Sequence, residues 1–389
     1  MKFWPFNRKS ETRAAPDPSW SALVNGGALS ASGAFVDTKA AESISAVFAC
    51  VQALSESTAT LPLHVFERLG NGDRTRADDT PLARVLREPN PHQSGVAFRE
   101  SMTASVLLHG NAYARIEHNA TGELIGLHPI EARSVTVLRL PSGRYVYEYP
   151  DEAGRVQRLL EEECFHLADR TDPGNIIGKS RIAIARDTLG LGLALRDHGS
   201  ATFRNGARLS GVLQTPHVMT DEAIGRLRES WQAQFSGTAN TGNTAILENG
   251  LQYTQLAMSL EDAQWIAAQQ FTTEEIARIY RVPPTMIGDL RFGSYQNTAE
   301  LGSQFVRYSL ARWIGLWEAE ISRQLLGPLA RRRYHAEHSV EGLLRGNPEA
   351  RADFYDKAIT SGWMTVDEVR RLENLPARGE RDAVETASA

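Results

Sequence analysis

Residues 298–326 read TAELGSQFVRYSLARWIGLWEAEISRQLL. Large apolar side chains recur in this stretch at three- and four-residue steps: Val306, Leu310, Trp313, Trp317 and Ile321. That spacing places them along one face of an α-helix. An aromatic stripe of this kind can line a cofactor site, but it more often packs against other helices, within one chain or between subunits. The pattern therefore predicts a long helix with one face buried in protein.

Two more helices and a hairpin are predicted upstream of this segment. Apolar spacing indicates helices near 221–236 and 261–281. Between them lie two short β runs, TAILE and LQYTQLA, separated by Asn249-Gly250. Asn-Gly is typical of a two-residue hairpin turn. A hairpin inserted between two helices would project from the far end of the helix pair.

The first half of the chain combines helices with strands. An apolar stripe of helical period ends at Pro62, and Thr80 and Ser94 are placed to cap two shorter helices, the second of which stops at Gly110. Over residues 111–168 the apolar period changes to two, with the turn sequences NATG, PSG and DEAG between the runs. This pattern predicts an antiparallel meander, so the fold class is α+β.

The remaining segments are predicted to be an arm and further helices. Residues 1–36 are rich in Pro, Ser, Ala and Gly, which is typical of a mobile arm. Helices are also expected near 180–204, 349–361 and 366–374. Thr365 and Glu368 have the spacing of a capping box, which would start the last of these helices.

Composition excludes several classes of protein. The chain has 389 residues, 42% of them hydrophobic and 23% charged, as in ordinary globular proteins. No apolar run reaches the length of a membrane span. The net charge of -5 is not that of a typical basic nucleic-acid-binding protein. Cys50 and Cys164 each lie in an apolar segment, which favours buried thiols over a disulfide or a metal site.

The segment GNIIGKS, Gly174 to Ser180, is the strongest hint of an enzyme. It follows a β run and opens a helix, as a phosphate-binding loop does. However, that loop has four residues between its first Gly and the GK pair, and this segment has three. Pro173 occupies the position that would restore the spacing, and proline has no N–H to offer a phosphate. We expect a tight turn in which Ser180 caps a helix.

No other pattern indicates a reactive centre, a metal site or a cofactor. His335 and His338 lie in the β-like run RRRYHAEHS, but their spacing matches no standard zinc framework, so an exposed polar strand is expected. Charge is uneven: residues 220–289 hold nine acidic and four basic side chains. Such a segment forms either an ordinary solvated face or a surface that repels a polyanion.

Several separated segments, taken in order, resemble the portal proteins of tailed bacteriophages. The resemblance is to the short branch found in long-tailed phages and gene transfer agent particles, and it covers about residues 38–376. No single motif is diagnostic, since their order and spacing carry the resemblance. The matching segments are SISAVFACVQALSESTATLPLHVFE, LLHGNAYARI, GKSRIAIARDTLGLGLAL, FRNGARLSGVL, EEIARIYRVPPTMIGD, LWEAEISRQLL and GWMTVDEVRRLENLP.

The resemblance implies a portal-like subunit made of an α/β wing, a helical stem, a small β-containing clip, a tunnel loop with a long helix, and a helical crown. The implied regions are a flexible arm (1–37), the wing (38–219), a stem helix (220–236), the clip (237–260), a second stem helix (261–288), the tunnel loop (289–298), the long helix and wing return (299–345), and the crown with the C-terminal tail (346–389).

The resemblance also implies sites and partners. Twelve subunits would form a ring at one capsid vertex, assembled in the bacterial cytoplasm and retained in the virion. Duplex DNA would pass through the ring without sequence-specific contacts, and the ring would contact the major capsid protein, the terminase large subunit and head-completion or tail adaptor proteins. The implied site residues are Arg291, Phe292, Ser294, Tyr295, Gln296 and Asn297 in the tunnel loop, Glu261, Asp262, Glu274 and Glu275 on an acidic stem, and Asn243, Glu248, Asn249 and Gln252 on the clip.

Two other functions remain open at this point. One is a different head or tail adaptor protein of the virion, which particle mass would distinguish from a closed ring. The other is a nucleotide hydrolase using Lys179, against which the short loop spacing argues.

Overall fold

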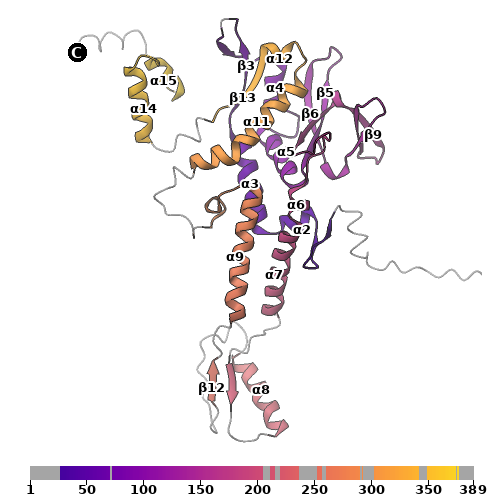
Figure 1. The fold of residues 1–389 in the computed structure, drawn as a ribbon, viewed down its shortest axis with the longest axis vertical. Coiled ribbons are helices and arrows are strands. Elements are labelled where there is room, and N and C mark those ends of the chain that lie inside the picture. The colour runs from indigo at the N-terminus through magenta and orange to yellow at the C-terminus, as the bar shows by residue number, and fades with distance from the viewer. Residues whose placement is uncertain are drawn as a thin grey trace, which may run out of the picture.

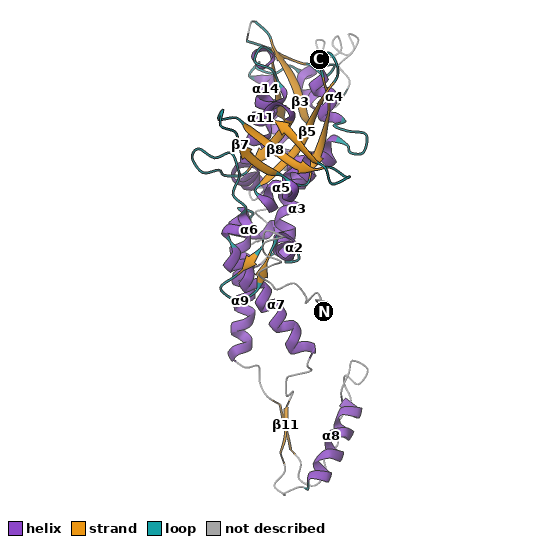
Figure 2. Ribbon diagram, turned by 90° about the vertical axis from the view of Figure 1, so that its right-hand side faces the viewer, coloured by secondary structure: helices purple, strands orange, loops and turns teal. Residues whose placement is uncertain are grey.

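The computed structural model describes residues 27–70, 72–204, 211–214, 220–235, 252–255, 260–289, 291, 302–340, 348–373 and 375. The molecule is elongated, with a broad body of helices and strands from which helices α7 and α9 run side by side (Figures 1 and 2). The small sheet β11-β12 and helix α8 lie beyond the ends of these two helices. The predicted α+β class is confirmed.

The element bounds within the described residues are as follows. The α-helices are α2 (Thr38–Glu42), α3 (Ser45–Thr60), α4 (Pro81–Arg87), α5 (Gly95–His109), α6 (Arg181–Ile184), α7 (Arg186–Arg204), α8 (Asp221–Phe235), α9 (Leu260–Tyr280), α11 (Ala311–Glu320), α12 (Ala330–Arg333), α14 (Pro348–Thr360) and α15 (Val366–Leu372). The strands are β1 (Ala28–Leu29), β2 (Phe35–Val36), β3 (Leu63–Arg68), β4 (Arg74–Arg76), β5 (Asn111–His118), β6 (Leu124–Ile130), β7 (Thr136–Arg139), β8 (Tyr145–Pro150), β9 (Val156–Leu160), β10 (Cys164–Ala168), β11 (Gly211–Gln214), β12 (Gln252–Gln255) and β13 (Tyr334–His338).

The predicted long helix forms the centre of the body. It runs from 302 to 325, with π-helical turns at Phe305–Leu310 and Ile321–Leu325 on either side of α11. All five residues of its apolar stripe are buried, and Trp317 is only 1% exposed. The Trp317 indole donates to the Thr103 hydroxyl at 3.0 Å and packs beside the rings of Phe98 and Phe165. The stripe thus serves helix packing within the chain.

The local helix signals are confirmed. Thr80 and Ser94 accept hydrogen bonds from the N–H groups three residues on, and so cap α4 and α5. Gly110 ends α5 with a φ of 82°, in the left-handed region that glycine adopts without a steric penalty. The capping box is also present, because Thr365 and Glu368 each accept the other's backbone N–H at the start of α15. Capping satisfies N–H groups that the helix itself leaves unpaired.

The single meander predicted over 111–168 is wrong. Its strands belong to two antiparallel sheets, with the orders β10-β5-β6 and β7-β8-β9. The first packs on α5 in the main core, and a smaller core lies between the two sheets, where Tyr113 of β5 and Cys164 of β10 meet Tyr147 of β8. A period of two shows which residues share a face, but not which strands are neighbours. Cys50 and Cys164 are buried free thiols, as predicted.

Strand β13 was expected to be exposed, and that expectation is wrong. It pairs with β3 near the other end of the sequence, in the sheet order β13-β3-β4. His338 is 4% exposed, and its backbone N–H donates to Glu318 at 2.7 Å. The three-residue spacing of His335 and His338 places them on opposite faces of the strand, so they do not form a joint site. His335 stacks on Phe66 instead.

Part of the expected mobile arm is structured. Residues 27–37 contain the β1-β2 hairpin, and Val36 belongs to the main core. The Ala31 N–H donates to the Asp187 carboxylate on α7 at 2.9 Å, which fixes the hairpin on that helix. Residues 1–26 lie outside the described part of the chain.

The helix that packs along α9 is α7, not the 220–236 helix that we expected. The Trp265 indole on α9 donates to the Leu195 carbonyl on α7 at 3.2 Å. Gly199 of α7 faces the same ring, since a Cβ atom there would lie 2.6 Å from it. Likewise, β12 pairs with β11, a partner from before α8 that the sequence analysis missed. The expected partner run, 244–248, lies outside the described residues.

Helices α14 and α15 near the C-terminus match the two helices predicted there, although α15 ends at Leu372 rather than 374. They meet through the Tyr355 hydroxyl, which donates to Glu373 at 2.8 Å. None of the helices in the described ranges is both long and apolar enough to cross a bilayer.

Candidate functional site

The body and the α7–α9 pair meet at Asp169, directly after β10. Its carboxylate is 2.7 Å from the Arg181 guanidinium on α6 and 2.6 Å from the Arg312 guanidinium on α11. Arg181 also donates to the Ile279 carbonyl in the last turn of α9. The Arg181 guanidinium lies over the rings of Tyr280 and Trp313. One buried ion-pair cluster therefore joins β10, α6, α9 and the long helix.

The pKa of Asp169 lies below its ordinary value. Burial alone raises this pKa, because it disfavours the charged carboxylate. The hydrogen bond and charge of Arg181, together with the charge of Arg312, act in the opposite direction and outweigh burial. Asp169 is therefore held as the anion that the two guanidinium groups need. Sequence reasoning missed this residue, because an Asp between Ala168 and Arg170 carries no local signal.

The loop from Gly174 to Ser180 is closed against the body. The Gly178 N–H donates to the Asn111 side chain at 2.7 Å, and the Lys179 N–H donates to the Arg170 carbonyl at 2.9 Å. These two N–H groups are the ones a phosphate would need, and both are already used. The Lys179 ammonium pairs with Asp172 at 2.6 Å. Ser180 caps α6, as predicted. The geometry is that of a structural turn.

We expect Lys179→Ala to leave nucleotide hydrolysis at the background rate of the unchanged chain, because the loop offers a phosphate no free cradle. The side chain is partly exposed, so the loss of its ion pair should cost at most about 1 kcal/mol of stability. Release of phosphate from ATP is the measurement. A clear ATPase activity that vanishes in this variant would contradict the expectation.

Two of the four predicted acidic stem residues, Glu274 and Glu275, take part in ion pairs. Glu275 pairs with Arg278 one turn away, and Glu274 is 3.4 Å from Arg291. Glu261 and Asp262 lie in the first turn of α9, and their side chains are outside the described part. The two described carboxylates at the upper end of α9 are thus partly neutralised.

Of the six predicted site residues in the tunnel loop, Arg291 is the one that the described part of the chain includes. Its guanidinium is bound by Asp289, with Nε 2.8 Å from the carboxylate. This contact lowers the pKa of Asp289 and raises that of Arg291. The other predicted residues, Phe292, Ser294, Tyr295, Gln296 and Asn297, lie outside the described residues, as do Asn243, Glu248 and Asn249 of the predicted clip. Gln252 of the clip set is exposed on β12.

Most of the described chain matches one known protein family. The model of the family described as phage portal protein matches residues 45–374. The chain belongs to the phage portal protein family. The matched region contains the whole Asp169 cluster, both helices α7 and α9, and the long central helix.

Named relatives agree with this assignment. The chain is 35% identical to the portal protein of Enterobacteria phage HK97 over 86% of its own length and 79% of the relative. It is 32% identical to the probable portal protein of Streptomyces phage phiC31, covering 92% of this chain and 80% of the relative. The fold resembles a chain in the neck of a native gene transfer agent particle, a structure computed with twelvefold cyclic symmetry. The TM-score is 0.60 at 22% identity, covering 92% of this chain and 98% of that one.

Portal proteins are structural components of the virion, and the present chain is one of them by family. Membership favours the portal function over the other adaptor protein and the nucleotide hydrolase that the sequence alone left open. It agrees with the closed loop at Lys179. Among the residues that the structure describes, no group of three or more His, Cys, Asp or Glu side chains is placed to hold a metal ion.

Proposed function

We propose that twelve copies of this portal protein form a closed ring at one vertex of the capsid, with duplex DNA passing through the central channel. The observation that carries the proposal is the likeness, over nearly the whole chain, to a neck protein whose particle was computed with twelvefold symmetry. A ring requires one patch of each subunit to contact a different patch of the next, in a geometry that closes.

The described surface offers apolar side chains for such contacts. Phe48 on α3 is 50% exposed, Phe271 on α9 is 56% exposed, and Tyr308 on the long helix is 58% exposed. Large exposed apolar groups on a soluble subunit often mark protein interfaces. Twelve helices at a spacing of about 10 Å would enclose a circumference of roughly 120 Å, which leaves room for a B-form duplex.

The regions of the ring subunit are proposed as follows. The α7–α9 pair serves as the stem, which replaces the sequence-based pairing of 220–236 with 261–288. The segment from 205 to 259, which includes β11, α8 and β12, serves as the clip that contacts the terminase large subunit and later the tail adaptor proteins (Figure 1). The body before α7 serves as the wing against the major capsid protein, and 346–389 serves as the crown.

Purified protein is expected to form rings near twelve subunits, because the exposed apolar groups on α3, α9 and the long helix need partners. Native mass spectrometry and negative-stain images measure subunit number and the central hole. Rings one subunit larger or smaller would still support the proposal. A stable monomer at micromolar concentration and moderate salt would argue against it.

The tunnel loop, 289–298, is proposed to point into the channel. Arg291 would approach DNA phosphates, and Phe292, Ser294, Tyr295, Gln296 and Asn297 would contact the duplex or neighbouring loops. Its base is supported by the pairing of Arg291 with Asp289 and Glu274. Shortening 291–296 to a Gly-Ser linker is expected to leave rings intact and to impair packaging or retention of full-length DNA. Normal packaging and retention in intact rings would refute this role.

A further inference from the structure

A second site lies in the body, away from the stem. A pocket of about 680 Å³ opens between strands β3 and β4, helix α4 and the first turn of α5. Its wall carries three arginines, Arg76, Arg87 and Arg99, together with the apolar side chains of Leu63, Val65 and Val96. Asp169, Arg181 and Arg312 do not line it.

Arg99 is a buried cation without an anion to balance it. It is 7% exposed, and its terminal nitrogens donate only to backbone carbonyls, those of Ala59 at 2.7 Å and, more weakly, of Leu61 and Leu86. Its Nε has no hydrogen-bond partner, and no carboxylate of the described residues forms an ion pair with it. Burial accordingly lowers the pKa of this guanidinium. The carbonyls lie at the C-terminal ends of α3 and α4 and supply partial negative charge. No full opposite charge lies beside the guanidinium, and a buried charge without one is costly.

The start of α5 also favours a bound anion. Ser94 accepts the Ala97 N–H, but the N–H groups of Gly95 and Val96 make no hydrogen bond to any described residue. Gly95 is buried, and the first turn contains no acidic side chain. A helix N-terminus carries partial positive charge and favours anions. Because side chains of a helix lean toward its N-terminus, Arg99 lies beside this turn. Two positive features therefore share one pocket.

The carboxylates of the pocket wall do not balance the positive charge of Arg99. Asp78 lies 3.4 Å from Arg76, which takes up its charge. Asp79 is exposed and forms no ion pair within the described part of the chain. Arg87 is exposed, and its guanidinium reaches only the Asp78 carbonyl, at 3.4 Å. An anion between Arg99, Arg87 and the helix start would have several unused donors.

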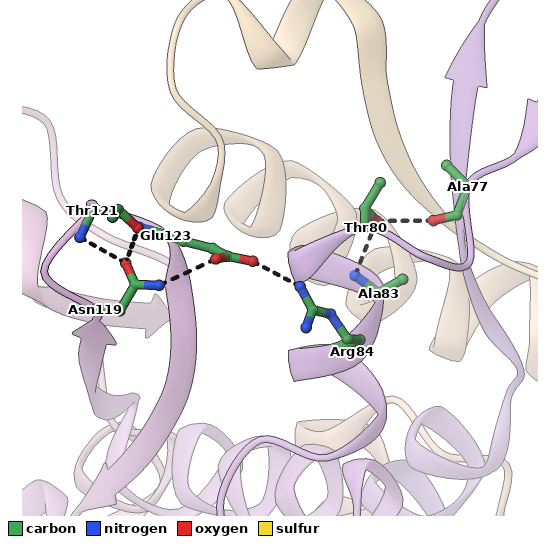
Figure 3. A network of polar contacts seen from close by, with 7 residues as sticks. All are labelled: Ala77, Thr80, Ala83, Arg84, Asn119, Thr121 and Glu123. Atoms are coloured by element: carbon green, nitrogen blue, oxygen red, sulfur yellow. Dashed lines mark hydrogen bonds and ion pairs between the residues drawn. The ribbon is translucent and has the colours of Figure 1, made fainter.

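Helix α4 is fixed on its other face, so the pocket wall is preformed. Arg84 pairs with Glu123 at 2.7 Å, and Asn119 in turn donates to Glu123 at 3.1 Å (Figure 3). Thr80 donates to the Ala77 carbonyl and caps the helix in the same view. A Cβ atom at Gly95 would collide with the Leu86 carbonyl, so the end of α4 and the start of α5 are in close contact. Arg87 is therefore held beside the first turn of α5.

We propose that this pocket binds a free phosphate-type oxyanion, bound by the Arg99 guanidinium, the Gly95 and Val96 N–H groups and the Arg87 side chain. A guanidinium combined with a helix N-terminus is the donor set that recognises phosphate oxygens. The source is a small free anion rather than the DNA backbone, because a stiff duplex cannot reach a guanidinium that is 7% exposed. The site is independent of ring formation and DNA passage.

The test is a titration of the full chain with inorganic phosphate, compared with sodium chloride at matched ionic strength. Calorimetry gives the affinity, and thermal unfolding gives the stabilisation that binding to the folded state produces. Arg99→Met and Arg87→Met are each expected to weaken phosphate binding about tenfold or more, because each removes a charged donor. Arg68→Met is the matched control: it changes an exposed arginine of β3 that lies outside the pocket and does not hold its wall, and the variant should bind phosphate normally.

Arg87→Met keeps the test decisive if Arg99→Met fails to fold, since Arg87 is exposed. The proposal is overturned if phosphate and chloride stabilise the chain equally. It is also overturned if both pocket variants bind phosphate as tightly as Arg68→Met. A third outcome would overturn the assignment to a free anion: a short DNA duplex binds, Arg99→Met abolishes that binding, and inorganic phosphate does not bind.

Discussion

Asp169→Asn is expected to lower the free energy of unfolding by about 3–5 kcal/mol, the usual cost of breaking a buried ion pair from one side. Asparagine keeps the size of the side chain but removes its charge. Arg181, whose side chain is 13% exposed, would then face only neutral acceptors, the amide oxygen of the new asparagine and the Ile279 carbonyl. Because four elements meet at Asp169, the loss should also loosen the connection between the body and the α7–α9 pair.

Chemical denaturation of the two proteins in the same oligomeric state measures this effect. Asp172→Asn is the matched control, since Asp172 is an exposed aspartate paired with Lys179 in the neighbouring loop. An exposed pair contributes about 0–1 kcal/mol, so this control should change little. Equal losses in the two variants would show that the Asp169 cluster is not a buried structural joint.

The Asp169 contribution should also depend on pH. The pKa of Asp169 is depressed in the folded chain, so its stabilising effect is fully present above the unfolded value of about 3.9. It is lost as the pH falls through the folded pKa, because the carboxyl group becomes neutral in both states. The stability difference between the unchanged chain and Asp169→Asn should therefore shrink in acid. A difference that grows as the pH falls below neutrality would contradict this assignment.

Trp317→Ala is expected to lower the free energy of unfolding by about 3–5 kcal/mol, because it removes a large side chain from the centre of the core. The indole is 1% exposed, contacts Phe98 and Phe165, and donates to Thr103. Replacement by alanine loses the buried apolar area and leaves a cavity. Trp317→Phe should cost less, since one ring remains and the loss is limited to the second ring of the indole and the hydrogen bond to Thr103.

Trp363→Ala is the control for this prediction. Trp363 is 60% exposed between α14 and α15, so truncating it removes little buried area. Denaturant midpoints and their slopes, measured on proteins of equal oligomeric state, compare the variants. If Trp363→Ala proved as destabilising as Trp317→Ala, the long helix would not be the centre of the core.

The amino-acid sequence by itself determined the features that depend on neighbours within a few residues. Helix caps at Thr80, Ser94 and Thr365 are local hydrogen bonds, and the end of α5 at Gly110 is a local backbone conformation. The buried stripe from Val306 to Ile321 follows from the helical period. The family was also accessible, because the order of several short segments survives in the sequence. The caps and the apolar stripe depend on contacts within one or two helical turns.

Only the tertiary structure decided which distant segments meet. Strand β13 pairs with β3, and Arg333 just before β13 contacts Glu67 on β3, 266 residues away. No local pattern encodes that pairing. The same holds for α7 beside α9 and for Arg99 facing an open pocket. An arginine or aspartate has the same local preferences whether it is solvated or buried. Its charge becomes decisive only when packing removes water and fixes which groups surround it.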